Sequence, residues 1–358
     1  MVKSKKVLGM KQTIYQWSDI SSEFGDNLIV GNGGSIAVAS NRFSYSSLYD
    51  RAIQHGFINK KVQNVFEEFS KQYRDFEFVL SNLITADHVN ECLSSGYNKR
   101  DNDVRKAYLD VRNSLIKTVR DLHPSTDETW SKVANIGHFV SRFKNIFYLN
   151  YDLLLYWATL SQKLKSTHSF SDGFNALISD DALDKHMLWE FSSNSLKGGE
   201  RPLSKIWYPH GSLMLYKTKL GNYERKISLP TANELRQLET FWRDSETVPL
   251  FICEGSTSEK VRRIRKSKYL SRVLNMSLPS IEKSLVIYGW SLSEQDQHIV
   301  EQLQKASIRK IAISIHKGDK DQTQLQEEID KVHKKLIVLN NRAEIFFFDA
   351  QSPGCWCH

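Results

Sequence analysis

The sequence predicts an α/β fold in which a doubly wound parallel sheet carries large helical insertions. Short hydrophobic runs typical of buried strands alternate with segments whose apolar residues recur at helical spacing. Such alternation favours a parallel sheet with helices on both faces. Four of the hydrophobic runs also end in a short polar motif, and ligands of open α/β sheets bind beyond the carboxyl ends of strands. The four motifs are therefore expected to meet in one cleft.

The first expected elements are a strand, a turn and a helix start over residues 27–36. Residues 46–143 then show helical periodicity almost throughout. The pattern is visible at Val62, Val65, Phe66 and Phe69. This run is too long for a single crossover between strands, so we interpret it as a helical insertion. Ser125 or Thr126 is expected to cap its last helix.

The sheet is expected to resume at residues 145–149, followed by a helix over 152–164 and a second, mixed insertion over 165–205. Further strands are expected at 206–209, 212–217, 249–252, 284–288, 309–315 and 343–348. Helices are expected after Pro230, over the basic stretch near 260–272, and at 294–306 and 319–335. The chain is therefore expected to form one domain over residues 27–348, between an N-terminal segment at 1–26 and a C-terminal tail at 349–358.

Composition restricts the classes of function. The chain has 358 residues, of which 40% are hydrophobic and 25% are charged, so it can bury a sizeable core. No apolar run is long enough to span a bilayer, and the basic start at residues 1–6 lacks the apolar segment of a secretory signal. The four cysteines do not form a disulfide framework. We therefore expect a cytoplasmic protein that does not bind membranes.

The last residues include three potential metal ligands, Cys355, Cys357 and His358. A structural zinc site needs about four ligands, and no second cluster is present to complete this one. We therefore expect a mobile tail here, and no metal site.

The net charge of +8 favours contact with polyanions. The densest basic stretch contains Lys260, Arg262, Arg263, Arg265, Lys266, Lys268 and Arg272. A solvated helix face explains it, because no zinc-finger or RNA-recognition signature accompanies it. Weak, nonspecific binding to nucleic acid is expected from electrostatics alone. A phosphate contact or an acidic partner surface is the alternative interpretation.

The first motif, Gly31-Asn32-Gly33-Gly34-Ser35, follows Leu28-Ile29-Val30. Glycines at this point allow a tight turn and a close approach to a phosphate, and the following helix start offers free amide groups. The dehydrogenase fingerprint is incomplete, because Ile36 occupies the third glycine position and Asp50 lies in a helical stretch. A simple glycine turn is the alternative.

Two further motifs contain Asn150 with Asp152, and His210 with Gly211 and Ser212. Asn and Asp are ordinary helix caps. They also suit a site in which an amide holds a ribose or a water molecule and a carboxylate fixes its orientation. A single histidine is more often structural, but one at an open strand end suits a general base near neutral pH.

The fourth motif begins at Gly289, after the strand expected at 284–288. Gly289 and Ser291 are candidate contacts to the ribose or phosphate of a nucleotide. Ser293 and Asp296 have the spacing of a capping box, which explains part of the pattern. His298 is expected on the following helix, and we assign it no role.

In this order, the motifs resemble those of the sirtuin-like family, and most closely its bacterial branch. The middle motif of that branch is similar to Asn150-Tyr151-Asp152-Leu153-Leu154, and its late motif is similar to Gly289 to Leu292 with Asp296. The resemblance covers residues 27 to about 315. Deacylating sirtuins carry a zinc ribbon with two Cys-x-x-Cys pairs, and this sequence contains no Cys-x-x-Cys. Sirtuin-like bacterial chains without the ribbon look like NAD-hydrolysing effectors of antiphage defence.

The resemblance implies a Rossmann-like domain that takes NAD as its substrate, without a metal, and cleaves it to nicotinamide and ADP-ribose. Asn150 and His210 correspond to the catalytic residues, and Asp152 is expected to orient Asn150 or to stabilise developing positive charge. The effectors of this branch work in assemblies or with a partner subunit. We therefore expect a homo-oligomer or a co-encoded, nucleotide-sensing partner protein.

The resemblance also assigns nucleotide contacts. Gly31, Gly33 and Ser35 correspond to the phosphate loop, and Phe43 corresponds to an aromatic residue of the flexible cofactor loop. The family's arginine after that aromatic residue is absent, because Ser44 stands there. With their neighbours, the nucleotide-binding candidates are Gly31, Asn32, Gly33, Gly34, Ser35, Phe43, Gly211, Ser212, Gly289, Ser291 and Asp296.

Two other functions remain open at the level of sequence. One is a non-catalytic sensor or scaffold that binds NAD or ADP-ribose without cleaving it. The other is a nucleic-acid-binding protein that uses the basic helix. A dehydrogenase is disfavoured, because its fingerprint is incomplete.

Overall fold

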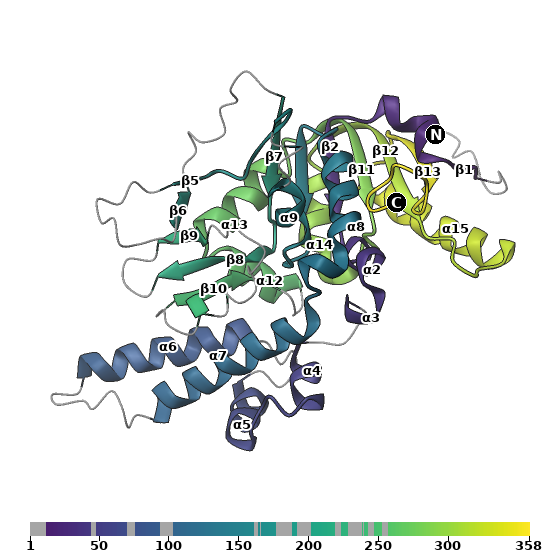
Figure 1. The fold of residues 1–358 in the computed structure, drawn as a ribbon. Helices are drawn as coiled ribbons and strands as arrows, with labels where there is room; N and C mark the ends of the chain where they lie inside the picture. Colours follow the sequence, from purple (N-terminus) through teal and green to yellow (C-terminus); the bar gives the residue numbers. More distant parts are fainter. Residues whose placement is uncertain are drawn as a thin grey trace, which may run out of the picture.

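Two sheets organise the chain in the computed structural model (Figure 1). The structure describes residues 12–43, 48–69, 76–93, 103–160, 164, 166–176, 188–191, 202–218, 223–227, 238, 240–242, 247–252 and 257–358. The larger sheet contains β1 (Ile14–Tyr15), β2 (Asn27–Val30), β3 (Asn145–Tyr148), β4 (Ser169–Ser171), β7 (Leu203–Trp207), β11 (Glu282–Tyr288), β12 (Ser307–Ile315) and β13 (Glu344–Asp349). Its order is β1-β13-β12-β11-β2-β3-β7-β4, and every pairing is parallel. The predicted α/β class is therefore confirmed.

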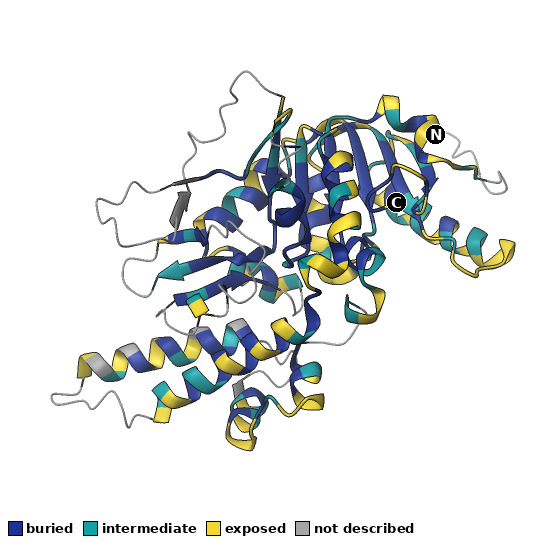
Figure 2. Ribbon diagram, viewed as in Figure 1, coloured by how far each residue is buried: buried dark blue, intermediate teal, exposed yellow. Residues whose placement is uncertain are grey.

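The central strands are buried on both faces, as parallel strands covered by helices must be. Leu28, Ile29 and Val30 of β2 have no exposed surface, and Figure 2 shows the middle of the sheet as buried. Val30 pairs with Tyr148 of β3 on one side and with Tyr288 of β11 on the other. Because these three strands end at the same level, the residues that follow them lie side by side.

Helices flank the two sheets (Figure 1). They are α2 (Asn32–Val38), α3 (Ser40–Phe43), α8 (Thr126–Val140), α9 (Leu154–Leu160), α12 (Thr257–Ile264), α13 (Lys268–Arg272), α14 (Gln297–Leu303) and α15 (Gln322–Leu339), with the short α1 (Trp17–Ile20) beside β1. Ser125 caps α8 in a capping box with Glu128, as the sequence predicts.

Of the helices within the insertion expected at 46–143, α8 packs beside α9. The others are α4 (Leu48–Gln54), α5 (Lys60–Phe69), α6 (Phe76–Leu93) and α7 (Asp103–Leu122). The two longest, α6 and α7, lie side by side and extend away from the large sheet (Figure 1). Tyr108 of α7 donates a hydrogen bond of 2.8 Å to the carbonyl of Thr247, which ties the insertion to the second sheet. No helix in the described part of the chain is long and apolar enough to cross a membrane.

The second sheet is antiparallel and was not expected. It contains β5 (Phe174–Ala176), β6 (Leu188–Phe191), β8 (Gly211–Thr218), β9 (Glu224–Ile227) and β10 (Thr247–Phe251), in the order β10-β8-β9-β6-β5. Only residues 208–210 separate β7 from β8, too few for the crossover that a parallel partner requires. Strand β8 therefore leaves the large sheet. Most of the mixed insertion at 165–205, and most of the segment after Pro230, lie outside the described residues.

The expectation of a mobile C-terminal tail is wrong. Cys355 and Trp356 are completely buried, and Cys357 is nearly so. The indole Nε1 of Trp356 donates a hydrogen bond of 2.8 Å to the carbonyl of Gly34. Its ring stacks on Tyr148 and Tyr288, with centroids 6.4 and 5.5 Å away. The end of the chain therefore forms part of the core beneath the first glycine motif.

Replacement of Trp356 by Ala is expected to lower the free energy of unfolding by about 3–5 kcal/mol, because it empties a fully buried aromatic site. Urea unfolding followed by circular dichroism measures the loss. Trp130→Ala is the matched control, since that side chain is 53% exposed, and its effect is expected to stay within about 0.5 kcal/mol. Equal effects of the two variants would contradict a packed C-terminal segment.

Candidate functional site

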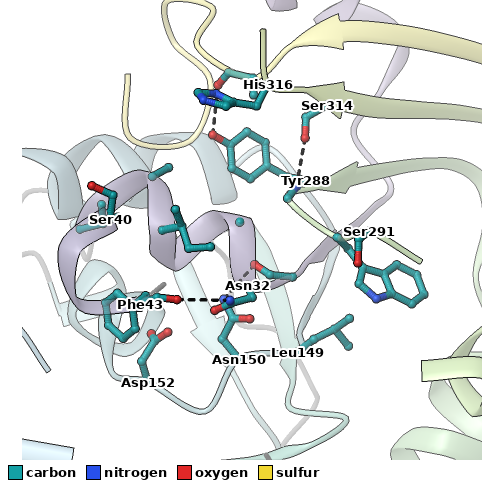
Figure 3. Close-up of a pocket in the computed structure, with 18 of the residues that line it drawn as sticks. Asn32, Ser40, Phe43, Leu149, Asn150, Asp152, Tyr288, Ser291, Ser314 and His316 are labelled. Carbon is teal, nitrogen blue, oxygen red and sulfur yellow. Dashed lines mark hydrogen bonds between the residues drawn. The ribbon is translucent and has the colours of Figure 1, made fainter. Parts of the chain in front are cut away.

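A cavity of about 1330 Å³ lies beyond the carboxyl ends of β12, β11, β2, β3 and β7 (Figure 3). Gly31, Asn150, His210 and Gly289 all line it, so the four sequence motifs do border one site. Adjacent strands lie about 4.8 Å apart, so this row of strand ends is roughly 19 Å wide. The cavity is therefore wide enough for an extended ligand.

The glycine motif packs directly against the backbone of the Gly289 turn. The amide of Gly33 donates to the carbonyl of Gly289 at 2.8 Å, and a Cβ on Gly33 would lie 2.7 Å from the Cα of Gly289. The amide of Gly31 donates to the carbonyl of Tyr288, and that of Gly34 donates to the carbonyl of Gly31. The glycines are thus required by contacts within the protein. The amides of Gly31, Gly33 and Gly34 are already paired, so they do not form the open phosphate cradle that the motif suggested.

Asn150 is held in one orientation. Its Nδ2 donates to the carbonyl of Gly31 at 3.0 Å and to the hydroxyl of Ser35 at 2.7 Å. A flipped amide would place Oδ1 against the Gly31 carbonyl, which can only accept a hydrogen bond. Both N–H groups are therefore occupied, and the side chain offers its carbonyl Oδ1 as the acceptor at the cavity wall.

Asp152 supports Asn150 through Ser35. Its Oδ1 accepts hydrogen bonds from the Tyr148 hydroxyl at 2.7 Å and the Leu154 amide at 2.9 Å. Its Oδ2 accepts a hydrogen bond from the hydroxyl of Ser35. Burial, together with the Asp152 charge, raises the pKa of Tyr148 well above its ordinary value, so the phenol stays a donor. Asp152 therefore fixes the direction of the Ser35 hydroxyl, which in turn accepts from Asn150.

His123, at the end of the helical insertion, also positions this loop. Its Nδ1 lies 2.9 Å from the Pro124 carbonyl and therefore carries the proton, while its Nε2 accepts from the Leu153 amide at 2.9 Å. Burial lowers the pKa of His123, which favours this neutral form. The ring also meets Phe43 edge-on, with centroids 6.0 Å apart. No motif in the sequence pointed to His123, because its partner loop lies about thirty residues further along the chain.

His210 lies in the turn between β7 and β8 and is only 4% exposed. Its ring is hydrogen-bonded to the backbone of Leu149, and its Nε2 lies 3.0 Å from the Nε2 of His298. Since a carbonyl only accepts, we assign the proton of His210 to Nδ1, toward Leu149, and the lone pair to Nε2. His298, which received no role from the sequence, therefore donates its Nε2 proton to that lone pair.

An ion pair lies beside the two histidines. The ammonium group of Lys260 is 2.8 Å from the Oδ1 of Asp296, and the same oxygen is 3.8 Å from the Nε2 of His210. The other oxygen of Asp296 accepts hydrogen bonds from Trp290 and Ser293 at 3.0 and 3.3 Å. Lys260 is buried, so the basic stretch is not simply a solvated helix face.

These charges decide the protonation of the site. Burial alone would raise the pKa of Asp296, but the positive charge of Lys260 and the hydrogen bonds from Lys260 and Trp290 hold that pKa below its usual range. Burial and the neighbouring Lys260 lower the pKa of His210 to about 4, against the opposing effect of Asp296. His210 is therefore neutral at pH 7, and Lys260 is the cation that keeps Asp296 ionised. In the sequence, one feature pointed to His298 as a site residue, namely its position two residues after the candidate Asp296.

His210, Asp296 and His298 are also metal-ligand types, and their ligand atoms lie within 4.8 Å of one another. However, the Lys260 ammonium already occupies the Asp296 oxygen that faces the histidines. A metal ion there would have to displace Lys260 or share the partly buried Asp296 carboxylate with it. The residues fit a neutral histidine pair beside an ion pair better than they fit a metal site.

The remaining candidates fall into two groups. Asn32, Phe43 and Ser291 line the cavity, and Asn32 donates to the carbonyl of Phe43 at 3.4 Å (Figure 3). By contrast, the cavity lining does not include Gly34, Ser35, Gly211 or Ser212. A Cβ on Gly211 would lie 2.1 Å from the carbonyl oxygen of Leu250, so this glycine faces β10. These four residues therefore support the site from behind.

Comparison with known protein families gives one match, to a family described as a domain of unknown function (DUF4917), over residues 28–356. A search of curated proteins finds no match. The matched region includes the second sheet, the larger sheet except β1 and the first residue of β2, the helical insertion and every candidate residue described above.

Acidification is expected to destabilise the protein through His210. The unfolded chain, with an ordinary pKa of 6.5, binds a proton before the folded chain does, because the folded pKa is about 4. The contribution of His210 to the free energy of unfolding is therefore fully present above pH 6.5. It falls as the pH drops toward 4, by up to about 3 kcal/mol.

Urea unfolding at pH 7 and pH 5 measures this effect. His210→Gln is expected to lose less stability than the wild type between the two pH values. The remaining loss reflects His298 and His123, whose pKa values burial also lowers. His138→Gln, at an exposed position on α8, is the control. An unchanged pH dependence in His210→Gln would contradict the neutral, buried state of this ring.

Proposed function

The chain belongs to the DUF4917 family, whose description assigns no activity, and we propose that it is an NAD glycohydrolase that releases nicotinamide and ADP-ribose. One observation supports this above all. An amide with a fixed orientation, Asn150, and a neutral imidazole, His210, line the same cavity as the glycine motif. The motifs whose order resembles that of sirtuin-like NAD hydrolases therefore also border one cavity.

The dimensions of the cavity support a dinucleotide as the substrate. The row of five strand ends from β12 to β7 is roughly 19 Å wide, which suits a molecule with two linked nucleosides. Asn150 and His210 lie on the β3 and β7 side of the glycine motif. The nicotinamide ribose is accordingly assigned to that side, and the adenosine to the side of β11 and β12.

The reaction breaks the bond between ribose C1′ and the nicotinamide nitrogen, and water supplies the new C1′ oxygen. Nicotinamide leaves as a neutral ring from a cationic one, so no general acid is needed. The transition state resembles an oxocarbenium ion, as in glycoside hydrolysis. The site must orient the ribose and the water and accept one proton.

Asn150 performs the orienting step in this proposal. Its Oδ1 accepts a hydrogen bond from a ribose hydroxyl or from the attacking water. Ser35 and the Gly31 carbonyl already hold the amide, so little conformational freedom is lost when the substrate binds.

His210 accepts the proton. Its Nε2 lone pair is the base, and a substrate hydroxyl or water must first replace the N–H of His298 there. Once protonated, the His210 Nε2–H can no longer face the His298 N–H. The Oδ1 of Asp296 lies 3.8 Å from that nitrogen and is the anionic acceptor beside it. Lys260 opposes this charge, so the proton is released again readily.

A second candidate is a non-catalytic sensor or scaffold that holds NAD or ADP-ribose. The occupied lone pair of His210 favours it, as do the paired amides of the glycine motif. Both features are also expected of a hydrolase at rest. From the family resemblance alone, we further propose a cytoplasmic antiphage effector that acts as a homo-oligomer or is activated by a partner protein.

Purified protein is expected to release nicotinamide from NAD, alone or with extract from phage-infected cells. Asn150→Ala and His210→Ala are each expected to reduce the rate by about 100-fold or more, because each removes a group that contacts the reacting ribose or water. Asn82→Ala and His138→Ala, on α6 and α8, are the matched controls and are expected to keep the wild-type rate.

Circular dichroism of each variant checks that the fold survives. Normal turnover in both site variants would exclude these catalytic assignments. Binding of NAD without release under either condition would instead support the sensor.

A further inference from the structure

We propose that the adenosine end of the cavity accepts a ribose with a 2′-phosphate, so that NADP is the preferred dinucleotide. This inference deepens the proposed function and depends on it for the orientation of the substrate. Its evidence is the charge of the cavity wall beyond β12.

The strand order fixes where the adenosine ribose would lie. The glycine motif follows β2, while Asn150 and His210 follow β3 and β7 on one side of it. A dinucleotide with its nicotinamide ribose at those residues extends in the other direction, across β11 to β12. Figure 3 shows Ser314 and His316 at the end of the site opposite Asn150 and Asp152. The second ribose is thus placed beside the end of β12 and helix α15.

The wall at this end is basic. It contains His316 directly after β12, and Lys331 and Lys335 from α15. In dinucleotide sites a carboxylate at a strand end accepts the ribose 2′-hydroxyl, whereas a basic side chain there accommodates a 2′-phosphate. After β11 come Gly289, Trp290 and Ser291, and after β12 come His316 and Lys317, so neither strand ends in a carboxylate.

Two acidic groups near this wall are neutralised by lysines, and a third, Glu294, offsets part of the charge of Lys335. Glu328, which lines the cavity, is paired with Lys320 at 2.7 Å. Asp349, at the end of β13, is paired with Lys317 at 2.9 Å. Lys331 is exposed and, within the described ranges, has no ion-pair partner. A positive charge is therefore left over at this end of the cavity.

Lys335 is held in a position from which it can bind the 2′-phosphate. Its ammonium group donates to the carbonyls of Ser291 and Leu292 at 2.7 and 3.1 Å, which holds it beside the turn after β11. Partial burial and the neighbouring charge of Lys331 lower the pKa of Lys335, against the opposing effect of Glu294. A bound phosphate monoester, with close to two negative charges at neutral pH, would relieve that repulsion. Two ammonium groups and an imidazole are donors suited to its oxygens.

The test is calorimetric titration of the full chain with 2′-phospho-ADP-ribose and with ADP-ribose. The phosphorylated compound is expected to bind about ten-fold tighter or more, with an advantage that shrinks as salt increases. Lys331→Glu is expected to abolish that advantage. Lys334→Glu makes the same charge change at an exposed position of α15 outside the cavity lining, and is expected to retain it. Competition with inorganic phosphate separates a site for the nucleotide from one for the free anion.

Equal binding of the two compounds by the wild type, or an undiminished preference in Lys331→Glu, would overturn the inference. So would binding of neither compound, or displacement by inorganic phosphate at equal concentration. Nicotinamide release is measured separately from NAD and from NADP. Release of nicotinamide from NAD without a preference for the phosphorylated compounds would contradict this inference and would still support the glycohydrolase. Tighter binding of the phosphorylated compound, with no nicotinamide released from either dinucleotide, would support this inference and contradict the glycohydrolase.

Discussion

The site depends on one contact, the packing of the glycine motif after β2 against the backbone of Gly289 after β11. No side chain separates the two turns, since a Cβ on Gly33 would lie 2.7 Å from the Gly289 Cα. The Gly31 carbonyl is then placed to accept from Asn150, and Trp356 holds the Gly34 carbonyl from beneath. Three parallel strands and the end of the chain thus converge on a few peptide groups. A larger residue at Gly33 would separate them and move Asn150 with them.

The second constraint is electrostatic. Lys260, Asp296, His210 and His298 form a buried cluster in which only one ion pair is charged at neutral pH. Burying two charges costs free energy that their attraction seldom returns in full. Asp296 offsets part of that cost by also accepting hydrogen bonds from Trp290 and Ser293. The ion pair therefore joins α12 to the turn after β11. Burial and the Lys260 charge keep both imidazoles neutral, against the opposing effect of Asp296.

The sequence predicted the parts of the fold that follow local rules. Hydrophobic runs that end in glycine or asparagine mark strand ends, and parallel topology brings such ends to one edge, so the shared cavity was foreseeable. The antiparallel sheet was not, because only the short connection at residues 208–210 forces β8 out of the larger sheet. Lys260, His123 and Trp356 were missed for a related reason. Each acts on residues that are distant in the chain, and a single sequence does not reveal such pairs.

The same contacts that shape the site also occupy the groups that the proposed substrate would need. The His210 lone pair accepts from His298, and three amides of the glycine motif are bonded within the protein. Exchanging one such hydrogen bond for another to substrate costs little, on the order of 1 kcal/mol, provided that the new partner is well placed. A partner that fails to reach His210 leaves the base bonded to His298. Under the proposed function, substrate binding and release of the base would therefore be coupled, and a dinucleotide that fills both ends of the cavity would drive that exchange better than one held only by its nicotinamide half.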